Sequence, residues 1–280
     1  MGLKFTDTKA KEKSRVMVVD AMNLAFRYKH QKVVHFLDDF KRTISSLANS
    51  YNCGTVIICT DEGSSVFRKT LYPEYKANRK ELYAKQTEQE KAEAEAFFAE
   101  FRQIIETLKE THIVFSYKGV EADDLAAFIV KISGNLPISH IQLISSDKDW
   151  DLLIRENVSR FSYVTRKEVT WDNWFDHYDV TPEQYMSLKT LQGDSGDNIK
   201  GVLQIGPKRA AELLEKYDSV FDIIDAIPIP GKLKWIQNLN ASKDLLELNI
   251  QLVDLVTYCE EAVGIENAKE ISERLENVFS

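Results

Sequence analysis

The sequence is poor in the residues that build zinc sites and disulfide frameworks. Only three cysteines occur among 280 residues (Cys53, Cys59 and Cys259), and no two of them are spaced as Cys-x-x-Cys. The five histidines are scattered, without a His-x-x-x-His pair. These spacings argue against a zinc site. The cysteines are typical of buried thiols in a reducing compartment.

Long apolar runs and the glycine loops of nucleotide-binding proteins are also missing. No run reaches eighteen apolar residues, so we expect no membrane span. The first fourteen residues are polar and lysine-rich and lack the apolar core of a signal peptide, which predicts a cytoplasmic protein. The absence of Gly-x-x-x-x-Gly-Lys and Gly-x-Gly-x-x-Gly argues against a nucleotide-driven motor or a dinucleotide enzyme.

What the chain does have is a regular alternation of strand-like and helix-like segments. Three short β-branched runs are typical of strands buried on both faces. Helical periodicity between them, at about 36–51, 88–110 and 121–133, predicts an α/β fold with a mostly parallel sheet. Ligands bind such sheets beyond the carboxyl ends of the strands. Each run leads to an aspartate at that edge: 15–19 to Asp20, 55–60 to Asp61, and 141–146 to Asp147 and Asp149.

The second half of the chain becomes helical. Residues 158–170 alternate in character and could form a pair of further strands. Thr181-Pro182-Glu183 is typical of a helix cap followed by proline at the first helical position. We therefore expect an α/β domain at 1–180 and a helical region at 181–280. Helices are expected at 183–191, 208–217, 219–226, 242–253 and 267–277.

Two acidic turns add to the strand-end aspartates. Three acids crowd the first turn of the helix expected at 121–133, which could simply be favourable interaction with the positive helix end. Two more lie on a glycine-rich turn that, taken alone, is typical of an Asx-rich loop. With the strand-end residues, the candidate metal ligands are Asp20, Asp61, Glu121, Asp123, Asp124, Asp147, Asp149, Asp194 and Asp197.

These nine carboxylates would repel one another in a single crevice without cations. Oxygen ligands without histidine or cysteine suit Mg²⁺ or Mn²⁺. Two such ions about 4 Å apart can activate a water and stabilise the leaving oxygen of a phosphodiester. The sequence therefore predicts a metal-dependent hydrolase of phosphodiesters.

The net charge of −8 has the wrong sign for a simple nucleic-acid binder. Without the nine candidate ligands, however, the remainder carries about +1. A lysine run is often only a solvated face, but tyrosines at 72, 75 and 83 are interleaved here, which suits phosphate contact and base stacking. The basic clusters are Arg68, Lys69, Lys76, Arg79, Lys80 and Lys85; Lys200, Lys208, Arg209 and Lys216; and Lys232 and Lys234.

A glycine-containing turn at 201–210 joins two expected helices. A tight turn before a helix start presents backbone N–H groups to a phosphate. The arrangement, at about 183–217, is similar to a helix-hairpin-helix motif, which grips the duplex backbone without reading sequence.

Taken in order, the motifs at 20–24, 73–79, 119–124, 146–150 and 193–210 resemble the structure-specific 5′-nucleases. The stand-alone flap endonucleases (5′-3′ exonucleases) of T-five-type bacteriophages are especially similar, over about residues 15–258. The resemblance implies cleavage of DNA near single-strand/duplex junctions, in replication or repair. It also implies two Mg²⁺ ions, for which Mn²⁺ can substitute, and 5′-phosphate products.

The resemblance also implies roles for single residues. Asp147 and Asp149 would be catalytic within the metal pocket, and Asp194 and Asp197 would support the second ion. Lys76 and Arg79 would polarise the scissile phosphate at the base of a helical arch, about 73–99, which admits a 5′ single strand. Val202 and Ile205 would offer backbone carbonyls to a K⁺ ion, although Gln204 stands where the motif usually has glycine. The implied DNA-binding residues are Arg27, Tyr75, Lys76, Arg79, Lys80, Lys189, Lys208, Arg209 and Lys232.

The implied partner is DNA with 5′ flaps, nicks or junctions, bound by a monomer in the host cytoplasm; no sliding-clamp peptide is seen. Two other functions are compatible with an acidic pocket. A ribonuclease with a related acidic pocket is usually near half this length and lacks the hairpin, so residues 201–210 discriminate against it. A non-catalytic junction-binding protein would lack acids, yet every expected carboxylate and Lys76 are present.

Overall fold

A six-stranded sheet forms the centre of the computed structural model, which describes residues 12–33 and 35–280. The strand order is β3-β2-β1-β4-β5-β6, and every neighbouring pair is parallel except β5 and β6. This confirms the predicted α/β class. The strands are β1 (Glu12–Asp20), β2 (Cys53–Cys59), β3 (Ile113–Phe115), β4 (His140–Ile144), β5 (Val158–Phe161) and β6 (Glu168–Val169).

The register of the three central strands aligns their carboxyl ends. Asp20 pairs with Cys59 of β2, and Val19 pairs with Ile144 of β4. The chain therefore leaves β1, β2 and β4 at one edge of the sheet, as parallel pairing requires. Side chains on both faces of these strands are buried, as the continuous apolar runs predict.

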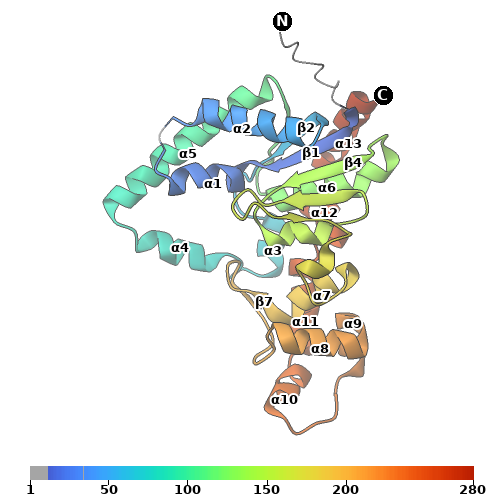
Figure 1. The fold of residues 1–280 in the computed structure, drawn as a ribbon. Helices are drawn as coiled ribbons and strands as arrows, with labels where there is room; N and C mark the ends of the chain where they lie inside the picture. The colour runs from blue at the N-terminus through green and yellow to red at the C-terminus, as the bar shows by residue number, and fades with distance from the viewer. Residues whose placement is uncertain (1–11, 34) are drawn as a thin grey trace, which may run out of the picture.

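Helices cover both faces of the sheet (Figure 1). On one face, α1 (Ala21–His30), α2 (Leu37–Ser50) and α5 (Glu88–Lys109) share a core rich in phenylalanine. On the other face lie α6 (Ala122–Ile132), α12 (Leu255–Val263) and α13 (Ile265–Phe279). The three cysteines are buried, as expected. None of the helices among the described residues has the length and apolar character needed to cross a bilayer.

Two short helices lie between β2 and α5. They are α3 (Val66–Leu71) and α4 (Ala77–Ala84), and α4 has no buried residue. In Figure 1, α4 runs at a distance from the sheet, and α5 leads back from its far end along α2. A capping box at Thr87 starts α5, so a sharp turn separates the two helices.

The carboxyl-terminal helices build a second apolar core below the sheet in Figure 1. Thr181 caps α7 with a capping box and Pro182 occupies its first turn, as predicted. The elements are α7 (Pro182–Gln192), β7 (Gly193–Asp194), β8 (Ile199–Lys200), α8 (Pro207–Tyr217), α9 (Val220–Ala226), α10 (Lys234–Asn240) and α11 (Lys243–Val253), and 3-10 helices lie at Ser133–Asn135, Lys148–Leu153 and Trp174–Asp176.

Candidate active site

The acidic edge is built first from the ends of β1 and β4. Asp20 is only 6% exposed, and its carboxylate accepts hydrogen bonds from Asn23 N at 3.0 Å and Ser145 Oγ at 2.9 Å. The same Ser145 hydroxyl accepts from Asp147 N at 3.1 Å. One serine therefore joins the two strand-end aspartates and fixes their separation.

The first turn of α6 meets this edge from the side of β2. Asp61 Oδ1 accepts from Ala122 N at 2.6 Å, so the acid after β2 caps the start of α6. Asp123 Oδ1 accepts from Trp150 Nε1 at 2.6 Å, which ties α6 to the loop after β4. Acids from segments more than a hundred residues apart therefore converge, as the strand-end pattern predicts.

Several carboxylates of this edge have raised pKa values and, among the described residues, no cation close enough to form an ion pair. Burial, with the charges of Asp61 and Asp147, raises the pKa of Asp20 to about 8. Desolvation, with Glu121, raises the pKa of Asp61, and burial, with Asp147, raises that of Asp123. Within the described residues, Asp20, Asp61, Asp123 and Asp147 form no ion pair.

The base of α4 contributes cations to the opposite side of the edge. Lys76 Nζ lies 2.8 Å from Glu121 Oε1 and 3.7 Å from Asp197 Oδ2, and Arg79 Nη2 lies 2.8 Å from Asp197 Oδ1. The backbone N–H of Lys76 donates to Asp197 O at 3.0 Å. Burial alone would raise the pKa of Glu121, but Lys76 and Arg68 outweigh it, and the pKa is lowered.

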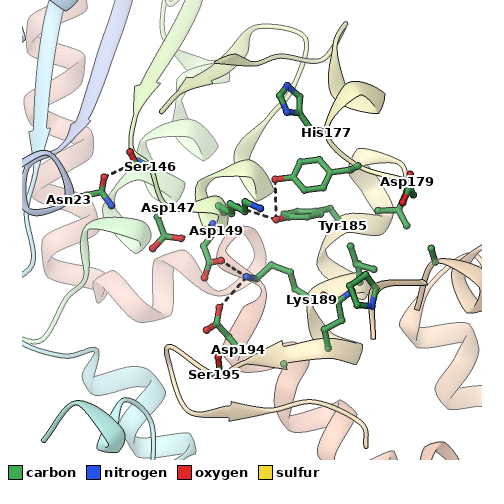
Figure 2. A pocket seen from close by; sticks show the side chains of 18 residues that line it. Asn23, Ser146, Asp147, Asp149, His177, Asp179, Tyr185, Lys189, Asp194 and Ser195 are labelled. Atoms are coloured by element: carbon green, nitrogen blue, oxygen red, sulfur yellow. Dashed lines mark hydrogen bonds and ion pairs between the residues drawn. The ribbon is translucent and has the colours of Figure 1, made fainter. Parts of the chain in front are cut away.

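A second lysine enters from α7. Figure 2 shows Lys189 reaching between Asp149 and Asp194, with its Nζ 3.4 Å from Asp194 Oδ2 and in contact with Asp149 Oδ1. A cavity of about 740 Å³ opens beside it, and Asn23, Asp147 and Lys189 are among its lining residues. The cavity provides space next to the acids for a charged ligand.

Three residues lie elsewhere than expected. Tyr75 is 2% exposed and its hydroxyl donates to Glu121 Oε2 at 2.8 Å and Asp197 Oδ2 at 2.9 Å, so its ring is not available to stack on a base. Asp124 is 0% exposed and both of its oxygens accept from Arg68, so it does not face the metal pocket. For the same reason Arg68 is not a surface residue for phosphate contact.

Five further basic residues are predicted to bind DNA, and their surroundings differ. Lys80, Lys208 and Lys232 are exposed. Arg27 donates from Nη1 to Tyr163 Oη at 2.9 Å and lies over that ring. Arg209 is exposed and donates from Nη1 to Gln204 O at 2.6 Å.

The turn between α7 and α8 is compact. A Cβ at Gly201 would lie 1.9 Å from Gln192 O, so only glycine fits there. Val202 N donates to Leu191 O at 2.9 Å, and Ile205 N donates to Val202 O at 3.0 Å. Gln204 adopts a φ of +69°, the left-handed conformation that glycine would take at lower cost.

Sequence reasoning missed the neutral groups that hold the acids. Ser145, Asn23 and Trp150 each bond to the edge, and none was singled out beforehand. The Ser-Ser pair directly before Asp147 was a usable signal, because serines at a strand end commonly bond to nearby side chains.

The donor set fits divalent cations of the magnesium type. The candidate ligands are all carboxylates, and the desolvated ones have raised pKa values that a cation would reverse. In the described part of the chain, no group of three or more acidic, histidine or cysteine side chains is already arranged to hold a metal ion. Metal binding would therefore require side-chain adjustment at this edge.

Comparison with known proteins agrees with this chemistry. Residues 15–180 match the family model of the 5′-3′ exonuclease N-terminal resolvase-like domain, and residues 180–274 match that of the 5′-3′ exonuclease C-terminal SAM fold. This chain belongs to the 5′-3′ exonuclease family. The predicted structure-specific 5′-nuclease is thereby confirmed, and the acidic edge is the candidate active site of a metal-dependent hydrolase.

Individual proteins that are similar to this chain are nucleases as well. The flap endonuclease of Escherichia phage T5 is 49% identical over 251 residues, which are 89% of this chain and 86% of the relative. A structure of the phage T5 flap endonuclease in a pseudo-enzyme-product complex with DNA and metal ions superposes with a TM-score of 0.90 and 46% identity, covering 94% of this chain and 98% of that one. The phage T5 5′-exonuclease with bound zinc ions gives a TM-score of 0.91 at 46% identity, covering 95% and 100%.

Proposed function

We propose that the nuclease uses two Mg²⁺ ions, replaceable by Mn²⁺, to cut DNA at 5′ flaps, nicks and junctions. It acts as a flap endonuclease and as a 5′-3′ exonuclease in replication or repair and leaves 5′-phosphate products. The observation that carries the proposal is the convergence of Asp20, Asp123 and Asp147 at one sheet edge, opposite Lys76 and Lys189.

Eight of the nine predicted ligands remain candidates to hold the ions, because Asp124 is engaged by Arg68. Two bound Mg²⁺ ions would supply a hydroxide nucleophile and neutralise charge on the leaving oxygen. Asp20, Asp61, Asp123 and Asp147, which form no ion pair among the described residues, are the natural site of the first ion. Asp149, Asp194 and Asp197, which now share lysines and an arginine, are available for the second.

Lys76 and Arg79 are placed to act on the scissile phosphate. Both lie at the start of α4 and pair with acids of the edge, so a phosphate bound beside those acids comes within reach of the two cations. Positive groups held there offset the charge that develops on the phosphate oxygens. Asp147 and Asp149 would be catalytic through the ions that they hold.

The remaining basic residues would bind the DNA strands. The arch, about 73–99, would admit the 5′ single strand, with Lys80 exposed on α4. Arg27 and Lys189 would contact the strand beside the pocket. Lys208, Arg209 and Lys232 would grip the downstream duplex through its phosphates, which binds without reading sequence. The carbonyl groups of Val202 and Ile205 would hold a K⁺ ion between the hairpin and the duplex.

We also propose that one chain is the working unit and that it acts in the host cytoplasm. A single chain supplies every acid and every cation of the edge. Buried cysteines suit a reducing compartment.

A 5′-labelled flap beside a nicked duplex tests the proposal directly. With Mg²⁺ or Mn²⁺ the expected product is a short labelled oligonucleotide that ends at the junction, and EDTA prevents its release. A product of unrelated length, or cleavage in EDTA, would refute a junction-directed metal nuclease. For the hairpin, Lys208→Ala should weaken duplex binding and lower its salt slope by about one; an unchanged slope would remove Lys208 from the interface.

A further inference from the structure

Arg68 is a buried cation that the proposed chemistry does not use. It lies on α3, is 3% exposed, and donates from Nη1 and Nη2 to the two oxygens of Asp124, each at 2.8 Å. Its Nε donates to the backbone oxygen of Leu252 on α11 at 2.9 Å. One guanidinium therefore binds a helix of the sheet domain and a helix of the carboxyl-terminal region at the same time.

On the sheet side, Arg68 reaches the acids of the active site. Asp124 directly follows Asp123 in the first turn of α6. Arg68 Nη1 also lies 3.9 Å from Glu121 Oε2, and the guanidinium carbon lies 5.9 Å from the centre of the Tyr75 ring, whose hydroxyl binds Glu121. The bidentate pair with Asp124 fixes this turn of α6 relative to α3.

On the other side, α11 is attached to the hairpin. Asn249 of α11 is buried, and its Nδ2 donates to Thr190 O of α7 at 3.0 Å and to Lys200 O of β8 at 2.8 Å. Leu252, which accepts from Arg68, lies one turn further along α11. A set of buried and part-buried hydrogen bonds thus runs from the hairpin through α11 and Arg68 to the first turn of α6.

We infer that Arg68 is a positioning residue that sets the distance between the duplex-binding hairpin and the acids, and thereby selects the phosphate that is cut. The inference rests on the proposed function, in which the hairpin holds the duplex. Successive phosphates of one strand are about 3.4 Å apart along the duplex axis. If the hairpin that holds the duplex moved by a few ångströms relative to the acids, a neighbouring phosphate would reach the site.

Two variants change this connection without leaving a buried charge unpaired. Arg68→Met combined with Asp124→Leu replaces the pair by apolar side chains of similar size, a change that buried pairs commonly tolerate. Arg68→Lys keeps the charge but loses the fork that binds Asp124 and Leu252 together. Lys131→Met is the matched control, because it removes an exposed 3.1 Å pair with Glu260 near the other end of α6.

Each variant is assayed with a 5′-labelled flap under single-turnover conditions in Mg²⁺, with DNA affinity measured in Ca²⁺ and folding checked by thermal unfolding. We expect both Arg68 variants to bind the flap as the wild type does. They should cut about ten- to a hundredfold more slowly and spread the products over neighbouring positions. Lys131→Met should give the single wild-type product at the wild-type rate.

The result that overturns the inference is a folded double variant and a folded Arg68→Lys variant that both cut at the wild-type phosphate at the wild-type rate. Slower cutting at an unchanged position would also contradict it, since it would give Arg68 no part in choosing the phosphate. Failure of the proposed function is distinguishable, because the wild-type enzyme itself would then give no junction-defined product.

Discussion

Lys76 Nζ lies 2.8 Å from Glu121 Oε1, so the N-cap residue of α4 is bound to the N-cap residue of α6, next to candidate metal ligands. Lys76 adopts a φ of +55° at the N-cap of α4, which is uncommon for a residue with a side chain. The strain is held in place by the bond from its N–H to Asp197 O. Such strained residues cluster at functional sites.

Replacing Lys76 by alanine should remove the cation that we propose to lie beside the reacting phosphate. We expect the single-turnover cleavage rate to fall by about 10²–10³-fold, as for the loss of one preorganised charge-stabilising group. Flap affinity in Ca²⁺ should change little. Lys243→Ala, which changes an exposed lysine at the start of α11, outside the basic clusters, serves as the control. An unaltered rate in Lys76→Ala would exclude Lys76 from the active site.

Tyr75→Phe tests whether the buried tyrosine supports the acids rather than the DNA. The hydroxyl bonds to Glu121 and Asp197, so its loss should weaken metal binding and slow cleavage by about tenfold. The measurement is the Mg²⁺ concentration at half-maximal rate. Tyr72→Phe, on a half-buried neighbour, should leave this midpoint in place. If DNA affinity fell while the Mg²⁺ midpoint stayed constant, a direct DNA contact would be the better explanation.

The metal-free protein should lose stability as the pH rises. The pKa of Asp20 is about 8 in the folded protein against an ordinary value of 3.8, so between these values the folded state holds a proton that the unfolded state has released. Stability conferred by that proton is present at low pH and is lost as pH rises toward 8. The pKa values of Asp61 and Asp123 are raised too and act in the same direction.

Burial and the charge of Arg15 lower the pKa of His140 below its ordinary value of 6.5. His140 therefore makes the folded protein more stable as the pH rises, but this effect is confined to pH values below about 6.5. Unfolding temperatures in EDTA between pH 6.5 and 8 should therefore fall by about 3–5 °C per pH unit. Asp20→Asn should make this slope shallower, and saturating Mg²⁺ should flatten it. A wild-type profile in EDTA that is already flat would show that Asp20 is ionised throughout.

The sheet and its acidic edge could be predicted from the sequence. Strand periodicity is a local property, and parallel pairing places the carboxyl ends of the strands at one edge. The runs ending at Asp20, Asp61 and Asp147 are β1, β2 and β4 with the loops after them, and the predicted helices at 36–51 and 88–110 are α2 and α5. The pair of further strands expected at 158–170 is β5 and β6. Short β3, by contrast, has only three residues and no recognisable period.

Side-chain partners could not be predicted because they depend on which segments meet in space. Arg68 and Lys76 look equivalent in a basic run, yet one is buried against Asp124 and the other faces Glu121. Tyr75 likewise reads as a surface aromatic until the fold buries it between α6 and the β7–β8 turn. The residue pattern predicts no helix at α1, α3, α10 or α12. α4 lies in the arch that only the resemblance implies, because a helix without buried residues has no apolar periodicity to detect.

Acids distant in sequence should hold divalent cations at the sheet edge. Diffraction from crystals soaked in Mn²⁺, recorded at the manganese absorption edge, tests it most directly. We expect anomalous peaks among Asp20, Asp123 and Asp147, and their loss in Asp147→Asn crystals. An edge without anomalous density in wild-type crystals that show manganese elsewhere would contradict the account.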